Sequence, residues 1–110
     1  MKEEQRVVNE WIQKHGVRYF NELTNTVLLM EEVGELSRYI ARDFGEQSFK
    51  DSEKKEDVKV HIKEEMADIL FVLICLANQM EIDLEEAFKE TIEKKTKRDN
   101  KRHFNNEKIK

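Results

Sequence analysis

Apolar residues recur along this chain at helical spacing and not with the alternation of a strand. On a helical wheel of about 100° per residue, they form stripes, and each stripe predicts one amphipathic helix. The stripes consist of Val7, Val8, Trp11 and Ile12; of Leu29, Val33, Leu36 and Ile40; of Ile62, Ile69, Leu73, Leu76 and Met80; and of Leu84, Ala87, Phe88 and Ile92.

Residues that favour helix ends indicate where these helices begin and stop. Asn21 is a suitable cap for the second helix, which is expected to stop at Gly45. Asp83 begins the fourth helix, with Glu86 three residues later in a capping-box arrangement. The four helices are therefore expected over residues 2–15, 21–44, 58–80 and from 83 onward.

Composition favours an all-α protein. The 110 residues contain no Pro and only three Gly, with abundant Glu, Lys, Leu and Ile, a choice that suits helices. This length is enough for one small domain. We expect that domain over residues 1–104, with a mobile charged loop at 46–57 and a disordered tail at 105–110.

The third helix also predicts an oligomer. Residues 69–77 are apolar on every side, so every side has to be covered. Four helices of one short chain would struggle to supply that cover. We therefore expect a homo-oligomer in which this stretch contributes to the subunit interface.

Charge and apolar-run length argue against two classes of partner. The net charge of −4, with both signs interspersed, does not favour a nucleic-acid binder. The longest apolar run has nine residues, far below the roughly 20 that span a membrane. The single cysteine, Cys75, lies in that run and is interpreted as a small buried hydrophobe, which fits a reducing cytoplasm.

Two carboxylate pairs carry the candidate chemistry. Glu32/Glu35 and Glu65/Asp68 each stand three residues apart, so each pair lies on one helix face, beside an apolar stripe. Carboxylates gathered near a core repel one another unless a cation is bound. An all-oxygen set suits Mg²⁺, Mn²⁺ or Ca²⁺ and not zinc. The alternative is a chance pattern on a solvated face, in a chain that is 40% charged.

A cationic stripe extends this hypothesis. Lys95 and Arg98 continue the inner stripe of the fourth helix beyond Ile92. They could form a phosphate clamp. The alternative is that the helix extends beyond the bundle and these residues are simply exposed to solvent. Metal-binding carboxylates near such cations suit phosphoryl chemistry. Glu31 is then the spare carboxylate that could accept a proton from water.

Two other interpretations compete with a metal-dependent enzyme. A non-catalytic helical oligomerisation or interaction module explains the bundle and the oligomer, but not acids beside apolar stripes. A ferritin-like di-iron bundle needs Glu-x-x-His pairs. That pattern is absent, because Ile12, Val58 and Asn100 stand three residues before the histidines.

The segments EEVGEL at 31–36, EMADIL at 65–70 and KKTKRD at 94–99 together resemble the MazG-type all-α nucleotide pyrophosphohydrolases. The resemblance implies a four-helix bundle completed by oligomerisation, as a homodimer or homotetramer. It implies hydrolysis of a nucleoside triphosphate between the α and β phosphates, giving monophosphate and pyrophosphate, in a role such as nucleotide-pool cleaning. It also implies Mg²⁺ held by the residues that match Glu32, Glu35, Glu65 and Asp68.

These considerations define the candidate site residues. The candidate catalytic residues are Glu31, Glu32 and Glu35, and the candidate phosphate contacts are Lys95 and Arg98. Trp11 is similar to the N-terminal-helix aromatics that stack on a base in parts of this family. The alternative for Trp11 is a core tryptophan.

Overall fold

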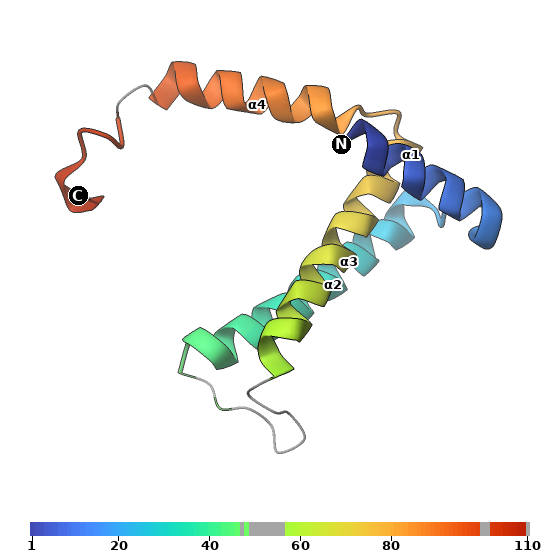
Figure 1. The fold of residues 1–110 in the computed structure, drawn as a ribbon, viewed down its shortest axis with the longest axis horizontal. Helices are drawn as coiled ribbons and strands as arrows, with labels where there is room; N and C mark the ends of the chain where they lie inside the picture. Colours follow the sequence, from blue (N-terminus) through green and yellow to red (C-terminus); the bar gives the residue numbers. More distant parts are fainter. Residues whose placement is uncertain (47, 49–56, 100–101, 110) are drawn as a thin grey trace.

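The computed structural model describes residues 1–46, 48, 57–99 and 102–109. Within these residues the fold is all-helical, with long helices α1 (Lys2–Trp11), α2 (Glu22–Phe44), α3 (Val58–Gln79) and α4 (Leu84–Asp99) (Figure 1). A π-helical turn at Ile12–Gly16 continues α1, and Glu107–Ile109 form a short 3-10 turn within the expected tail. The predicted all-α class is confirmed. Most of the expected loop at 46–57 lies outside the described residues.

The ends of α2 and α4 are capped as their sequences predict. The Asn21 side chain accepts a hydrogen bond from the backbone N–H of Thr24 at 2.8 Å. Asp83 Oδ1 accepts from the backbone N–H groups of Glu85 and Glu86 at 3.0 and 3.3 Å. Each acceptor satisfies N–H groups that have no partner inside the helix.

Helices α2 and α3 form an antiparallel pair at the centre of the molecule (Figure 1). At one end of the pair, Asn25 Nδ2 donates to Gln79 Oε1 at 2.8 Å. At the other end, the rings of Tyr39 and His61 stack with their centroids 4.9 Å apart. Contacts at both ends set the alignment of the two helices, and this alignment positions the acids of the site.

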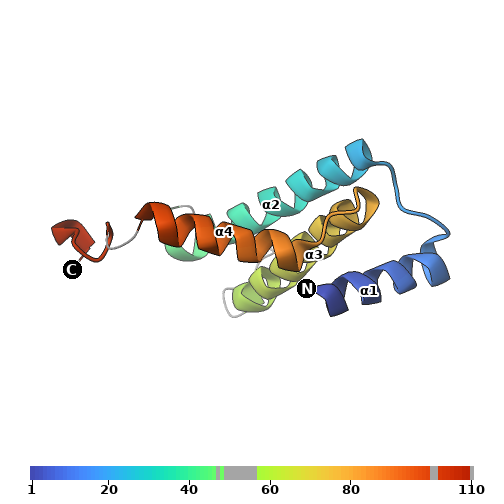
Figure 2. The same cartoon turned by 90° about the horizontal axis from the view of Figure 1, so that it is seen from above.

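Helix α1 packs against the end of α3 that is near Gln79 (Figure 2). Val8 is buried with Ile74 and Cys75. The ring of Trp11 meets the ring of Phe71 edge-on, with centroids 5.7 Å apart, a geometry that aromatic pairs favour. The core of the single chain therefore lies where α1 meets α3.

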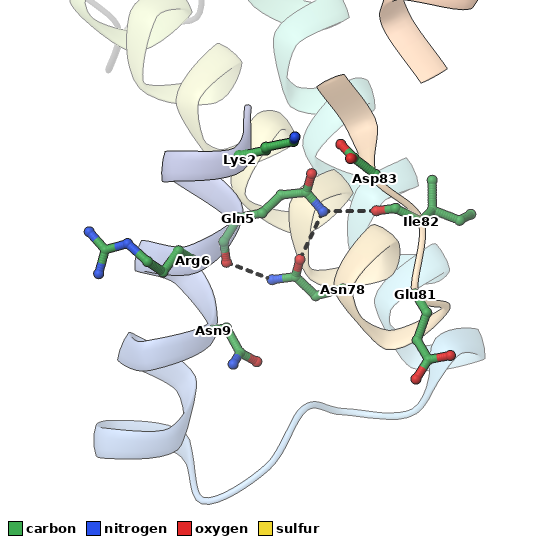
Figure 3. Close-up of a pocket in the computed structure, with 8 residues that line it drawn as sticks. All are labelled: Lys2, Gln5, Arg6, Asn9, Asn78, Glu81, Ile82 and Asp83. Atoms are coloured by element: carbon green, nitrogen blue, oxygen red, sulfur yellow. Dashed lines mark hydrogen bonds between the residues drawn. The ribbon is translucent and has the colours of Figure 1, made fainter. Parts of the chain in front are cut away.

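Polar groups fasten α1 to the turn between α3 and α4 (Figure 3). Gln5 Nε2 donates to Asn78 Oδ1 at 3.0 Å and to the carbonyl oxygen of Ile82 at 2.9 Å. Asn78 Nδ2 returns a hydrogen bond to the Gln5 carbonyl at 3.0 Å. These residues line an open polar cavity of about 480 Å³. The side-chain amides of Gln5 and Asn78 that face it already bond to each other.

Helix α4 leaves the α2–α3 pair instead of packing along it (Figure 1). Glu81 in the preceding turn has a positive φ of 56°, and the turn directs α4 outward. Phe88 is 66% exposed and Ile92 47% exposed. The expectation that the apolar stripe of α4 is buried is therefore wrong for its outer half in the single chain: Leu84 packs against the core and Ala87 is half-buried, but Phe88 and Ile92 are exposed.

Part of the apolar stretch at residues 69–77 is likewise exposed to solvent. Ile74, Cys75, Leu76 and Ala77 are buried, whereas Leu70 and Leu73 are about 40% exposed (40% and 41%). Leu70, Leu73, Leu84, Ala87 and Phe88 line an apolar groove between α3 and α4, which we call the α3–α4 groove. Among the described helices, none has the length and apolar character needed to cross a membrane.

Candidate functional site

Three carboxylates from two helices meet at the centre of the α2–α3 pair. Glu32 belongs to α2, and Glu65 and Asp68 stand one helical turn apart on α3. One oxygen of each lies within 4.8 Å of the others. The structure thus brings together three of the four acids that the sequence suggested as metal ligands, and we call them the carboxylate cluster.

The electrostatics of the carboxylate cluster favour a bound cation. Glu65 Oε2 is buried and has no hydrogen-bond partner in the described part of the chain. A hydrogen bond with Glu32 that forms only when Glu65 is protonated, burial, and the negative charges of Glu32, Asp68 and Glu35 together raise the pKa of Glu65 to about 7. A cation among these oxygens would satisfy the buried oxygen and remove the repulsion, so the residues fit a hard divalent ion.

The other two acids of the EEVGEL segment lie outside this cluster. Glu35 is exposed, and its carboxylate accepts a hydrogen bond from Arg38 at 2.9 Å. The Arg38 guanidinium also lies 4.4 Å from the centre of the Tyr39 ring. Glu31 is exposed as well. The side chain of Glu35 is therefore held by a cation of its own helix.

A largely apolar cavity lies next to the carboxylate cluster. Leu28 stands one turn before Glu32, and Val72 one turn after Asp68, so the cavity and the cluster share the α2–α3 pair. We call it the aromatic cavity; it has a volume of about 340 Å³ and is lined by Trp11, Ile12, Gly16, Arg18, Tyr19, Phe20, Asn25, Leu28, Phe71, Val72 and Cys75.

Trp11 lines this cavity and is 51% exposed, so it is not a fully buried core residue. Asn25, which is buried at the cavity wall, and its partner Gln79 were not predicted as site residues from the sequence. Asn25 is a polar residue on the apolar face of α2, and that position is the signal from which its role could have been predicted.

The cationic stripe of α4 does not reach the carboxylate cluster within one chain. Arg98 is exposed and makes two hydrogen bonds to Asp99, at 2.8 and 3.0 Å. Lys95 is also exposed. Because α4 projects away from the α2–α3 pair (Figure 1), both residues are separated from the acids that they were expected to assist.

The model of the MazG nucleotide pyrophosphohydrolase domain matches residues 20–103. The chain belongs to this MazG family. YpjD of Bacillus subtilis (strain 168) is 38% identical over 102 residues, which cover 93% of this chain and 88% of YpjD. A crystal structure of YpjD, described as a candidate pyrophosphatase, has a TM-score of 0.72 and 37% identity, covering 86% of this chain and 90% of that one.

A second solved structure agrees with this assignment. The Bacillus-conserved MazG protein, described as a nucleotide pyrophosphohydrolase, has a TM-score of 0.69 and 35% identity, covering 84% of this chain and 85% of that chain. The predicted MazG-type fold is confirmed, and this MazG chain is a nucleotide pyrophosphohydrolase. A purely structural interaction module is therefore set aside.

Proposed function

We propose that this MazG enzyme is a Mg²⁺-dependent nucleoside triphosphate pyrophosphohydrolase, with Mn²⁺ as a possible substitute. It cleaves between the α and β phosphates, releases monophosphate and pyrophosphate, and serves nucleotide-pool cleaning in the cytoplasm. The observation that carries the proposal is the carboxylate cluster, with a buried Glu65 oxygen that has no partner among the described residues. A metal held there would neutralise phosphate oxygens and lower the pKa of a water nucleophile.

The position of each acid in the structure supports a different role for it. Glu32, Glu65 and Asp68 would hold the metal, since their oxygens already converge. Glu35, one turn beyond Glu32, would join them by exchanging its ion pair with Arg38 for the cation, because the two pairings compete for the same oxygens. Glu31 is exposed beside Glu32 and accepts the proton of the attacking water.

Hydrolysis of ATP or CTP with millimolar Mg²⁺ tests this proposal directly. We expect equal amounts of nucleoside monophosphate and pyrophosphate, and no diphosphate. In water enriched in ¹⁸O, the label should enter the monophosphate, because the water attacks the α-phosphorus. Release of inorganic phosphate with diphosphate would contradict the proposal, as would equal rates in excess EDTA.

We further propose that the active form is a homodimer or homotetramer in which the second copy supplies the missing cations. The α3–α4 groove and the exposed stripe of α4 (Phe88 and Ile92) offer an apolar surface for that copy. A neighbouring α4 could then bring its Lys95 and Arg98 to the triphosphate, which they cannot reach in their own chain. Arg offers a bidentate fork and Lys a point charge for such a ligand.

Two defective variants distinguish a second-copy contribution from a remote structural role. Arg98→Ala should lower kcat/KM by about 10- to 100-fold, at about 1.4 kcal/mol per tenfold, since it removes charge-assisted hydrogen bonds. Mixing it with Glu65→Gln should restore activity well above the mean of the two, because some sites then combine intact acids with an intact Arg98. Lys97→Ala, a neighbouring charge off the stripe, is the matched control and should be near wild type.

The oligomer itself is checked by light scattering at micromolar concentration. A mass near the 13.2 kDa of one chain would contradict the proposal, as would a mixture whose activity equals the mean. If Arg98→Ala also changes the mass, Arg98 is instead part of the subunit contact.

A further inference from the structure

The aromatic cavity contains a buried amide that matters for substrate choice. Asn25 lines the cavity and is only 4% exposed. Its Nδ2 donates to Gln79 Oε1 at 2.8 Å and to the carbonyl oxygen of Phe20 at 3.4 Å. Both amide hydrogens are therefore used, whereas Oδ1 accepts no hydrogen bond from the described residues and keeps some exposed surface. The side-chain oxygen Oδ1 of Asn25 is therefore available to accept a hydrogen bond from a ligand.

The orientation of this amide is dictated by its neighbours. The Phe20 carbonyl can only accept hydrogen bonds, and it accepts from both Asn25 Nδ2 and Gln79 Nε2. Gln79 Nε2 also donates to Glu22 Oε1 at 3.3 Å, which leaves Gln79 Oε1 to receive the Asn25 donor. Rotating the Asn25 amide by 180° would set its oxygen against two other acceptors. Asn25 Oδ1 is thus a fixed acceptor.

Among the other polar side chains of the cavity, the Tyr19 hydroxyl is fully engaged, whereas Arg18 and Trp11 are exposed. The Tyr19 hydroxyl donates to Asn9 Oδ1 at 2.8 Å and accepts from Asn78 Nδ2 at 3.0 Å. Arg18 is exposed and donates to the Tyr19 carbonyl at 2.8 Å. A flat ligand in this cavity would therefore meet aromatic and aliphatic walls with one fixed acceptor among them. A buried acceptor that finds no donor is costly, so the wall discriminates by chemistry as well as shape.

The position of Asn25 relates this acceptor to the reaction. Asn25 precedes Glu32 by seven residues, which is about 10 Å along a helix axis, a separation that a nucleoside can bridge. With its α-phosphate at the carboxylate cluster and its base in the aromatic cavity, the edge farthest from the sugar meets Asn25. That edge carries an amino group in cytosine and adenine and an oxo group in uracil, thymine and guanine.

We propose that Asn25, held by Gln79 and the Phe20 carbonyl, makes this enzyme select triphosphates whose base has an amino group at pyrimidine position 4 or purine position 6. The inference rests on the proposed function, because it places the triphosphate at the carboxylate cluster. An amino group donates to Asn25 Oδ1. An oxo group sets two acceptors face to face, and the locked amide does not turn to accommodate it.

Matched substrate pairs test the proposal without any mutation. CTP against UTP and ATP against ITP each exchange the amino group for an oxo group on the same ring. We expect kcat/KM to favour the amino member of both pairs by about 10- to 100-fold, as for sites that pair a substrate N–H with a buried acceptor. Equal rates within a pair, or preference for the oxo member, would overturn the selection by Asn25. If no triphosphate is hydrolysed, the proposed function itself fails.

Two variants then identify the residue responsible. Asn25→Ala should bring the amino-to-oxo ratio toward one, because the acceptor is gone. Gln79→Ala should also lower the ratio, because the Asn25 amide becomes free to turn; the ratio and not the overall rate is the readout, since Gln79 also helps to align α2 with α3. Thr26→Ala is the matched control, since Thr26 is exposed beside Asn25 and bonds only to the Glu22 carbonyl; its ratio should equal wild type.

Circular dichroism melting checks that each variant is folded. If Asn25→Ala does not fold, the Gln79→Ala ratio decides the question alone. A folded variant that loses activity equally on both members of a pair would show a structural role and overturn the proposal.

Discussion

Replacing Glu65 by glutamine is expected to lower kcat/KM for triphosphate hydrolysis by about a thousandfold. Glu65 is the central member of the carboxylate cluster, with one oxygen buried and without a partner in the described chain. Glutamine keeps the shape but removes the charge that a divalent ion requires. Losing roughly 4 kcal/mol of metal-supplied stabilisation of the transition state corresponds to about three factors of ten.

Steady-state kinetics over a Mg²⁺ titration measure this effect, and calorimetry of Mg²⁺ or Mn²⁺ binding separates metal loss from a damaged fold. Glu64→Gln is the matched control, because it makes the same change one residue away on an exposed side chain that lies 3.8 Å from His61. It should stay near wild type. Glu65→Gln activity within tenfold of wild type would argue against the metal site.

Without a divalent metal, the protein is expected to become less stable as pH rises from about 5 to about 8. The folded-state pKa of Glu65 is raised to about 7 from an ordinary value of 4.5, so between these values the folded chain holds a proton that the unfolded chain releases. This contribution to the free energy of unfolding is fully present below about pH 4.5 and is lost as pH rises through about 7.

Bound metal should reverse this trend, because a cation replaces the proton among the same oxygens. The increase in Tm on adding Mg²⁺ should therefore be largest near pH 8 and smallest near pH 5.5. Scanning calorimetry in EDTA and in Mg²⁺ across this range measures both effects. The difference between wild type and Glu65→Gln isolates this carboxyl from other titrating groups. A metal-induced shift that does not depend on pH, or that is absent, would contradict the expectation.

The sequence by itself determined most of the local structure. The end of α2 before Gly45 and the caps at Asn21 and Asp83 follow from residues within one or two turns of each helix end. The pairing of acids on one helix face also follows from spacing alone, because three residues are close to one helical turn. Glu65 and Asp68 accordingly lie side by side in the cluster.

Only the tertiary structure decided which of these side chains meet across helices. The sequence treated Glu32 and Glu35 alike, but the alignment of α2 with α3 brings Glu32 to Glu65, whereas Arg38 holds Glu35. The amide of Asn25 became a fixed acceptor only through Gln79, which is 54 residues away in the chain.

Helix α4 shows most clearly which features the sequence determines and which only the tertiary structure decides. Its start and its apolar stripe are local properties that the sequence predicted. Its direction depends on the turn around Glu81, where a positive φ sends the helix away from the α2–α3 pair. Helical periodicity specifies which face of a helix is apolar, but not what covers that face. What lies opposite depends on contacts between segments far apart in sequence, and the described chain leaves Phe88 and Ile92 of α4 exposed.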